Sequence, residues 1–152
     1  LVFLADQDDV WTPGRLSIMV DRLLTKDLVF INGKICDAFL NPTGLTISDW
    51  RKSRTGFFIN LFRNSYIGCT MGFKSNLLKK VLPIPQRVTM HDQWIGLLAE
   101  LNGKTEFISE IGIMYRRHDK NITNLKSSSS LVTKILTRIQ MLILLLGRSY
   151  TR

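Results

Sequence analysis

Hydrophobic and polar positions along the chain follow two different periods, which predict a mixture of strands and helices. Apolar runs typical of strands cover residues 1–5, 28–39, 105–109 and 111–115. Apolar residues recur at helical spacing over residues 13–25, 57–62, 91–102 and 131–146. The continuous apolar run at the start is typical of a buried strand in the parallel sheet of an α/β fold.

Residues 45–56 are polar and basic and predict a surface loop. They follow the turn-forming residues Asn41-Pro42-Thr43-Gly44. We interpret Arg51, Lys52 and Arg54 in this loop as a solvated face. The helix predicted next, over residues 57–62, is expected to pack on the core because its Phe and Leu residues share one face.

Three carboxylates, Asp6, Asp8 and Asp9, follow the opening apolar run. Anions this close repel one another, and removing them from water is costly, so they are stable either in water or around a cation. The carboxyl ends of strands in open α/β sheets are where ligands bind. Oxygen ligands on a short loop suit Mg²⁺ or Mn²⁺. The alternative is an acidic turn that caps the next helix.

The composition excludes several classes of protein. The 152 residues are 45% hydrophobic and 22% charged, which is typical of one globular domain and not of a disordered chain. Cys36 and Cys69 form no CxxC motif and have no histidine pair nearby, so we expect neither a zinc site nor a disulfide framework. The net charge of +9 favours anionic partners, namely nucleic acid, acidic lipid headgroups or phosphorylated substrates.

Residues 126–152 differ in character from the rest of the chain. A serine-rich linker leads into the strongly apolar residues 131–146, which contain Lys134 and Arg138. This run is shorter than the ~20 apolar residues that a spanning helix needs. We therefore predict an amphipathic helix that lies on an anionic membrane surface. The alternative is a terminal helix packed on the domain or on the missing part of it.

Two further stretches carry groups that a ligand could meet. Residues 64–73 contain Gly68 and Gly72 within an apolar run, which indicates either backbone that lies close to another group or a bulged strand. Asp92 lies in the first turn of the helix predicted at 91–102, where the helix dipole stabilises a carboxylate. That position accounts for Asp92 structurally, and it would also hold a general base on a rigid element.

Four stretches in order resemble family-2 glycosyltransferases with the GT-A fold, and most of all the bacterial rhamnosyltransferase-like branch that builds surface polysaccharide. Phe3–Trp11 resembles the family's DxD strand end, and Tyr66–Phe73 its glycine-containing acceptor-side strand. His91–Trp94 resembles the helix start that carries the catalytic base, and Tyr115–His118 the segment that closes over the donor diphosphate. The resemblance covers residues 1–122, with His91 standing where an acid is common.

The resemblance implies a Rossmann-like, three-layer α/β fold with a mixed sheet. Residues 1–125 would be the C-terminal part of a GT-A domain, truncated at the N-terminus because the half that binds the nucleotide base is absent. The chain lacks an initiator Met and opens in a strand, which also indicates a fragment. Residues 126–152 would add a linker and the amphipathic helix.

The implied reaction is an inverting transfer of a sugar from a nucleotide-sugar donor to a saccharide, in bacterial surface polysaccharide synthesis. The acceptor would be lipid-linked, and the enzyme would be peripheral on the cytoplasmic face of the cell membrane. Asp92 would be the general base. The implied ligands of Mg²⁺ or Mn²⁺ are Asp6, Asp8 and His118. The donor diphosphate would lie against Asp6, Asp9, Arg116 and Arg117. The acceptor and donor sugar would lie against Trp11, Gly68, Cys69, Thr70, His91, Gln93 and Trp94.

Three alternatives to an active glycosyltransferase remain at this stage. The residues Phe3–Val10 can also be aligned with the first motif of haloacid-dehalogenase-like phosphatases, in which Asp6 would be the nucleophile, but no later acidic pair follows. A basic module that binds nucleic acid should interleave exposed aromatics with its basic residues, whereas most Phe and Trp here have core-like spacing, so nucleic acid is not an expected partner. The third alternative is an inactive glycosyltransferase fragment.

Overall fold

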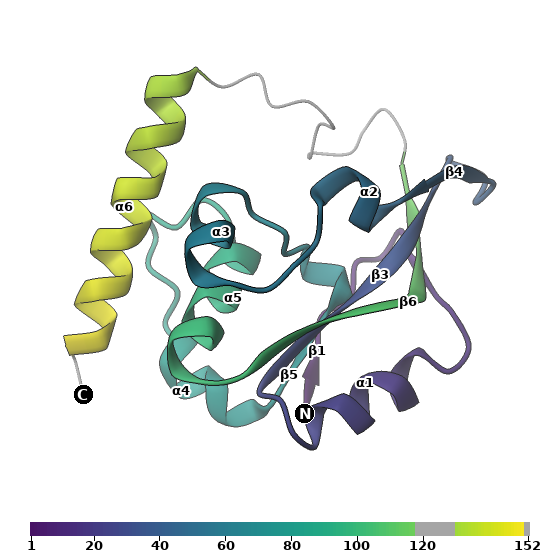
Figure 1. Cartoon of the computed structure of the whole chain (residues 1–152), viewed down its shortest axis with the longest axis horizontal. Coiled ribbons are helices and arrows are strands. Elements are labelled where there is room, and N and C mark those ends of the chain that lie inside the picture. Colours follow the sequence, from purple (N-terminus) through teal and green to yellow (C-terminus); the bar gives the residue numbers. More distant parts are fainter. Residues whose placement is uncertain (118–129, 151–152) are drawn as a thin grey trace.

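The computed structural model describes residues 1–117 and 130–150, which form a curled mixed sheet with helices packed against it (Figure 1). The strands are β1 (Val2–Phe3), β2 (Val10–Trp11), β3 (Leu28–Cys36), β4 (Pro42–Thr46), β5 (Met71–Phe73) and β6 (Thr105–Arg116). The helices are α1 (Arg15–Leu23), α2 (Ile47–Arg51), α3 (Phe57–Phe62), α4 (Leu78–Val81), α5 (His91–Asn102) and α6 (Leu131–Tyr150). Short 3₁₀ turns at Gly68–Thr70 and Ser75–Leu77 precede β5 and α4.

The sheet is built around one parallel pair. Its strand order is β1-β5-β3-β6-β2, and β4 pairs with β3 outside this path. Strands β3 and β6 run parallel, and the other pairs are antiparallel. The two runs predicted at 105–109 and 111–115 form the single strand β6, whose register against β3 shifts around Asn32.

Strand β3 is buried on both faces, which explains its uninterrupted apolar sequence. Because successive side chains point to opposite faces, Leu28 and Phe30 join a core with α5, α3 and α6. Val29 and Ile31 join a second core with α1 through Met19 and Leu23. The expectation of an α/β protein is thereby confirmed.

The opening strand corrects one prediction. We expected it in a parallel arrangement, but β1 pairs antiparallel with β5, with Val2 opposite Phe73. It is only half-buried and two residues long, because it lies at the edge of the sheet, where one neighbour is enough. The apolar run indicated a strand correctly, but it carried no information about the direction of its partner.

The loop predicted over residues 45–56 is also corrected. Residues 42–46 form β4, and residues 47–51 form the helix α2. The Thr46 side chain accepts a hydrogen bond from the Asp49 amide while the Asp49 carboxylate accepts one from the Thr46 amide. This capping box satisfies two amides at the helix start and fixes where α2 begins.

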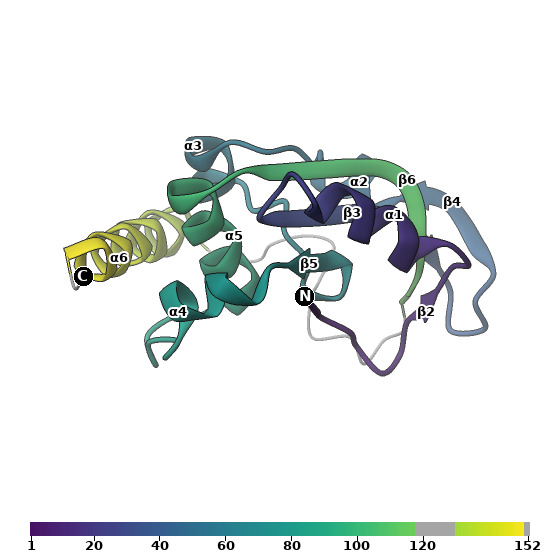
Figure 2. The same cartoon turned by 90° about the horizontal axis from the view of Figure 1, so that it is seen from below.

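The remaining helices lie where helical periodicity predicts them. Helix α1 lies within its predicted range, and α3 and α5 have their predicted bounds. Gly103 follows the end of α5. Helix α6 lies beside α3, α4 and α5, at the end of the molecule away from α1 and β4 (Figures 1 and 2). None of the helices in the described ranges combines the length and apolar character that a bilayer crossing requires.

Candidate functional site

The acidic loop crosses one end of the sheet. It connects β1, which pairs with β5, to β2, which pairs with the C-terminal half of β6. The loop therefore spans the carboxyl end of the parallel pair β3 and β6, where ligands bind in open α/β sheets. It is fastened to β6 by the Arg116 amide, which donates to the Asp9 Oδ1 atom at 2.9 Å.

Two carboxylates of this loop converge on the 3₁₀ turn before β5. One potential ligand atom from each of Asp6, Asp9 and Cys69 lies within 4.8 Å of the others. Asp6 is exposed and Asp9 is half-buried, while Cys69 is fully buried. Burial raises the pKa of Asp9. Hydrogen bonds from the Cys69 side chain and the Arg116 amide act against this shift, while the nearby charges of Asp6 and Asp8 add to it.

The chemistry of this group fits a hard divalent cation held by oxygen atoms. The Asp9 Oδ2 atom is buried and receives no hydrogen bond from the described residues that meets normal geometry, so a cation would satisfy it. Burial, followed by the charge of Asp9, raises the pKa of the Cys69 thiol far above its usual range. Because only a thiolate ligates metals well, Cys69 is not suited as a ligand. Asp6 and Asp9 supply the one or two carboxylates that Mg²⁺ usually takes from a protein.

A buried arginine lies behind the acidic loop. Arg15 is 1% exposed, and its guanidinium donates to the Cys69 carbonyl oxygen at 2.5 Å. The same guanidinium lies 4.1 Å from the centre of the Trp11 ring. Burial lowers its pKa to about 10, which the charges of Cys69 and Asp9 partly oppose. Arg15 therefore remains a cation at neutral pH and balances part of the negative charge of the loop.

The start of α5 lies against the same 3₁₀ turn. A Cβ atom placed on Gly68 would lie 3.4 Å from His91 Nε2 and 4.0 Å from Leu4 Cδ1. These contacts bring together the glycine-containing stretch, the first residue of α5 and the entrance to the acidic loop. Gly68 thus lies where backbone passes close to two other elements, one of the two possibilities that its sequence context left open.

Asp92 is held in the first turn of α5 in a largely desolvated position. Removal of its carboxylate from water raises its pKa, while the Gln93 amide, which donates to Oδ1 at 2.7 Å, and the charges of His91 and Arg51 act in the opposite direction. Desolvation is the largest of these effects. The result is a carboxylate that accepts a proton more readily than an ordinary aspartate.

Arg51 and Arg117 form a cationic cluster over two aromatic rings near Asp92. Their guanidinium carbons lie 4.1 and 5.5 Å from the centre of the Trp50 ring, which stacks on Tyr115. Burial lowers the pKa of Arg51, the charge of Asp92 opposes this, and the charge of Arg117 adds to it. Among residues 1–117 and 130–150, Arg51 Nε and Arg117 Nη1 are buried and have no hydrogen-bond partner. Two guanidinium groups with such donors can bind an oxyanion.

Three residues predicted to contact the sugars are corrected, because the structure buries them. Trp94 is fully buried, and its indole N–H donates to the Val81 carbonyl oxygen at 3.1 Å. Thr70 is buried, and its hydroxyl donates to the Ile67 carbonyl oxygen. Cys69 packs among Ile35, Ile47 and Ile113. These three side chains are packed in the interior and are not exposed to a substrate.

The other predicted residues have mixed outcomes. Gly68, His91 and Asp92 lie together beside the loop, as described above. The Gln93 side-chain amide donates to the Asn60 and Leu61 carbonyl oxygens and so attaches α5 to α3. Trp11 is half-buried between Arg15 and Phe3. Asp8 is half-buried and acts on Asp9 through its charge. His118 lies outside the described residues.

Sequence reasoning did not identify Arg15, Arg51 or Trp50 as parts of this region. For Arg15 a signal was present, because Arg15, Met19 and Leu23 are the buried residues of α1 and follow one another at four-residue spacing. For Arg51 the signal was the capping box at Thr46 and Asp49, which predicts a helix and therefore an ordered Arg51.

The chain was compared with known proteins by sequence and by structure. No protein-family model, no curated protein and no solved structure matches it.

Proposed function

We propose that this chain is part of an inverting glycosyltransferase with the GT-A fold, similar to family 2, and that it transfers a sugar from a nucleotide-sugar donor to a saccharide. The observation that supports the proposal is the meeting of the four stretches that carry the resemblance. The acidic loop is hydrogen-bonded to the end of β6 and lies beside Cys69. Gly68, next to Cys69, lies against His91. Asp92 follows His91 and acts on Arg51 through its charge.

The departing diphosphate would lie between the acidic loop and the arginine cluster. Asp6 and Asp9 would hold Mg²⁺ or Mn²⁺ beside Asp8, and a bound cation supplies Lewis-acid stabilisation of the negative charge on the leaving group. Arg117, which lies one residue beyond the Asp9-binding amide of Arg116, would donate to phosphate oxygens from the other side. Arg51 would join it, since both guanidinium groups have an unused buried donor.

Asp92 would remove the proton from the acceptor hydroxyl. Desolvation raises its pKa, which makes its carboxylate a stronger base than that of an exposed aspartate. The hydroxyl oxygen would attack the anomeric carbon from the face opposite the diphosphate and so invert that centre. One base on the acceptor side is sufficient for this displacement, and the proposal requires no covalent intermediate on the protein.

A lipid-linked saccharide at the cytoplasmic face of the cell membrane is the acceptor that we propose. The excess of positive charge on the chain, +9 in 152 residues, favours both the phosphates of such a molecule and the anionic surface that carries it.

The proposal is tested by titrating UDP, GDP and dTDP into the protein by calorimetry, with and without Mn²⁺. We expect at least one nucleotide to bind only with the metal, and Asp9→Asn to weaken that binding by about tenfold or more. Asp92→Asn should bind as the wild type does but lose transfer on the order of 10²- to 10⁴-fold. Asp21→Asn, at an exposed position on α1, is the matched control.

Equal nucleotide binding without metal, or unchanged transfer by Asp92→Asn, would contradict the proposal. The phosphatase alternative is separated by a second probe. Beryllium fluoride with Mg²⁺ forms a stable adduct on the nucleophilic aspartate of a phosphatase, which would be Asp6, whereas we expect no adduct on this chain.

A further inference from the structure

Two neighbouring helices, α3 and α6, expose large apolar side chains. On α6, six residues recur at helical spacing and are each 49–66% exposed: Val132, Ile135, Leu136, Ile139, Ile143 and Leu146. On the adjacent helix α3, Phe58 is 72% exposed and Phe62 is 62% exposed. We call these eight residues the α3–α6 face. A face of this size on a soluble surface indicates a contact with something else.

The exposure does not result from a loosely attached helix. Met141 and Leu145, on the opposite side of α6, are buried in the main core. Arg138 donates to the Phe62 carbonyl oxygen, and Gln140 donates to the Arg87 carbonyl oxygen at 2.7 Å. Arg148 donates to the Lys80 carbonyl oxygen at 2.8 Å. Helix α6 is therefore fixed in orientation, with one apolar side packed inward and the other directed outward.

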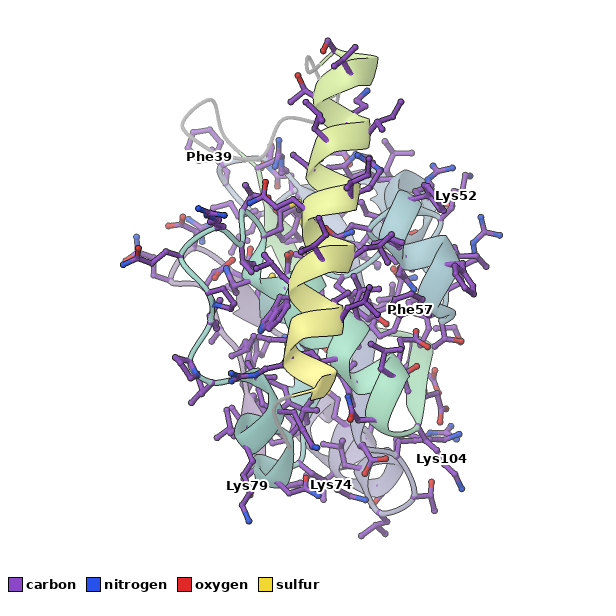
Figure 3. All side chains as sticks on the ribbon, turned by 90° about the vertical axis from the view of Figure 1, so that its left-hand side faces the viewer. Phe39, Lys52, Phe57, Lys74, Lys79 and Lys104 are labelled. Atoms are coloured by element: carbon purple, nitrogen blue, oxygen red, sulfur yellow. The ribbon has the colours of Figure 1, made fainter. Side chains whose placement is uncertain are left out.

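Three segments that include α3, α4 and α6 are rich in positive charge. Residues 50–64, 78–91 and 131–150 contain ten Lys and Arg and no Asp or Glu. The chain has 21 Lys and Arg and 12 Asp and Glu in total, so the rest of the sequence contains 11 and 12 and is nearly neutral. The positive excess of the protein is thus concentrated in these three segments. In Figure 3, which faces α6, the labelled lysines Lys52 and Lys79 lie on either side of the helix.

We propose that the α3–α6 face is a docking surface for an anionic lipid bilayer. Helix α6 would lie in the plane of the membrane, with its outward apolar residues and the two phenylalanines among the acyl chains near the headgroups. The surrounding Lys and Arg would meet the lipid phosphates. This orientation requires no bilayer crossing, in agreement with the composition of the helix.

Charge separates a bilayer from the other occupants of such a face. A second copy of the chain would bring the same Lys- and Arg-rich segments face to face, and this repulsion is unfavourable at an isologous interface. Nucleic acid would pair its phosphates with the Lys and Arg, but it would leave the aliphatic residues of α6 exposed, because single-stranded bases stack on aromatic rings. An anionic bilayer satisfies both the charge and the apolar surface.

The proposal is independent of the glycosyl transfer reaction and is tested without any sugar substrate. The chain is mixed with phosphatidylcholine vesicles that contain either no anionic lipid or about 30% phosphatidylglycerol, and the bound fraction is measured by flotation. We expect binding to the anionic vesicles only, with a decrease as the salt is raised from about 0.1 to 0.5 M.

Two double variants separate the apolar contribution from the charge. Ile139→Glu with Ile143→Glu should reduce the bound fraction about tenfold or more, and Lys52→Glu with Arg54→Glu should do the same. The matched controls are Leu16→Glu with Leu24→Glu, exposed on α1, and Lys34→Glu with Lys104→Glu, exposed elsewhere. All four should unfold at temperatures close to that of the wild type, because every altered side chain is exposed.

Three results would overturn the proposal. The first is equal flotation with neutral and anionic vesicles. The second is binding that the controls reduce as much as the α3–α6 variants do. The third is concentration-dependent dimerisation, lost in Ile139→Glu with Ile143→Glu, without flotation, which would assign the face to a second copy. Failure of nucleotide binding would leave these outcomes unchanged, so the two proposals fail separately.

Discussion

Asp92 occupies a position where the fold disfavours its charged form. Burial is the largest influence on its pKa and raises it, although the Gln93 amide and two nearby cations act against the shift. A raised pKa in the folded state means that the folded protein binds this proton more tightly than the unfolded chain does. The stability that Asp92 contributes is therefore present at low pH and is lost as the pH rises through its folded pKa.

This linkage gives a prediction for Asp92→Asn, which cannot ionise. The variant should have a higher melting temperature than the wild type at pH 7–8, and the difference should disappear toward about pH 3, where an aspartate is protonated in both states. Thermal unfolding followed by circular dichroism across this range is the measurement. A variant that is less stable than the wild type at neutral pH would show that the charged form of Asp92 stabilises the fold.

Arg15 illustrates what could be predicted at the residue scale. Apolar spacing over residues 13–25 groups Leu16 and Leu24 with Met19 and Leu23, but Leu16 and Leu24 are 46% and 75% exposed. The buried side is instead rotated so that Arg15 faces inward with Met19 and Leu23. Hydrophobicity alone predicts that the leucines are buried. In the structure Arg15 is buried instead, because its guanidinium donates to the Cys69 carbonyl oxygen and lies over the Trp11 ring.

At the scale of elements, periodicity predicted helices better than it predicted strand partners. The helices at 57–62 and 91–102 were found where apolar spacing placed them. The predicted parallel pairing of β1 was wrong, because the partner of β1 is β5, which lies about seventy positions later in the sequence. The helix α2 was missed because its five residues are too few for periodicity, and only its capping box marks it.

The packing of α5 on the residues before β5 depends on a glycine and gives a second prediction. A Cβ atom at Gly96 would overlap the ring of Tyr66. That ring cannot move, because its hydroxyl donates to Glu100 at 2.7 Å and its edge packs on Phe30. Gly96→Ala should therefore lower the free energy of unfolding by about 1–3 kcal/mol, as measured by urea denaturation.

Gly147 on α6 is the matched control for Gly96. It is also in a helix, but a Cβ atom there would meet nothing within 4 Å. Gly147→Ala should be neutral or stabilise the protein by up to about 1 kcal/mol, since alanine favours the helical backbone. If both substitutions cost the same, the loss at Gly96 would reflect helix propensity and not the Tyr66 contact.

At the scale of the whole molecule, the candidate site joins segments that the sequence keeps far apart. The Arg116 amide donates a hydrogen bond to Asp9, 107 positions earlier in the sequence, and the Arg15 guanidinium donates one to the Cys69 carbonyl oxygen, 54 positions later. The resemblance predicted that these segments meet, but it could not indicate that Asp9 turns inward beside Cys69 or that Arg51 faces the same region. Those features depend on the register of β2 against β6 and on the capping of α2.

The central claim is that the acidic loop, the residues around Gly68, the start of α5 and the end of β6 form one site for a metal ion and a diphosphate. Its most direct test is an NMR titration of the ¹⁵N-labelled chain with Mn²⁺ and a nucleoside diphosphate, because bound Mn²⁺ broadens the amide signals closest to it. We predict joint broadening at residues 6–9, 67–69, 91–93 and 116–117, and its loss in Asp9→Asn. Broadening confined to the acidic loop, with residues 91–93 and 116–117 as unaffected as those of α6, would contradict the claim.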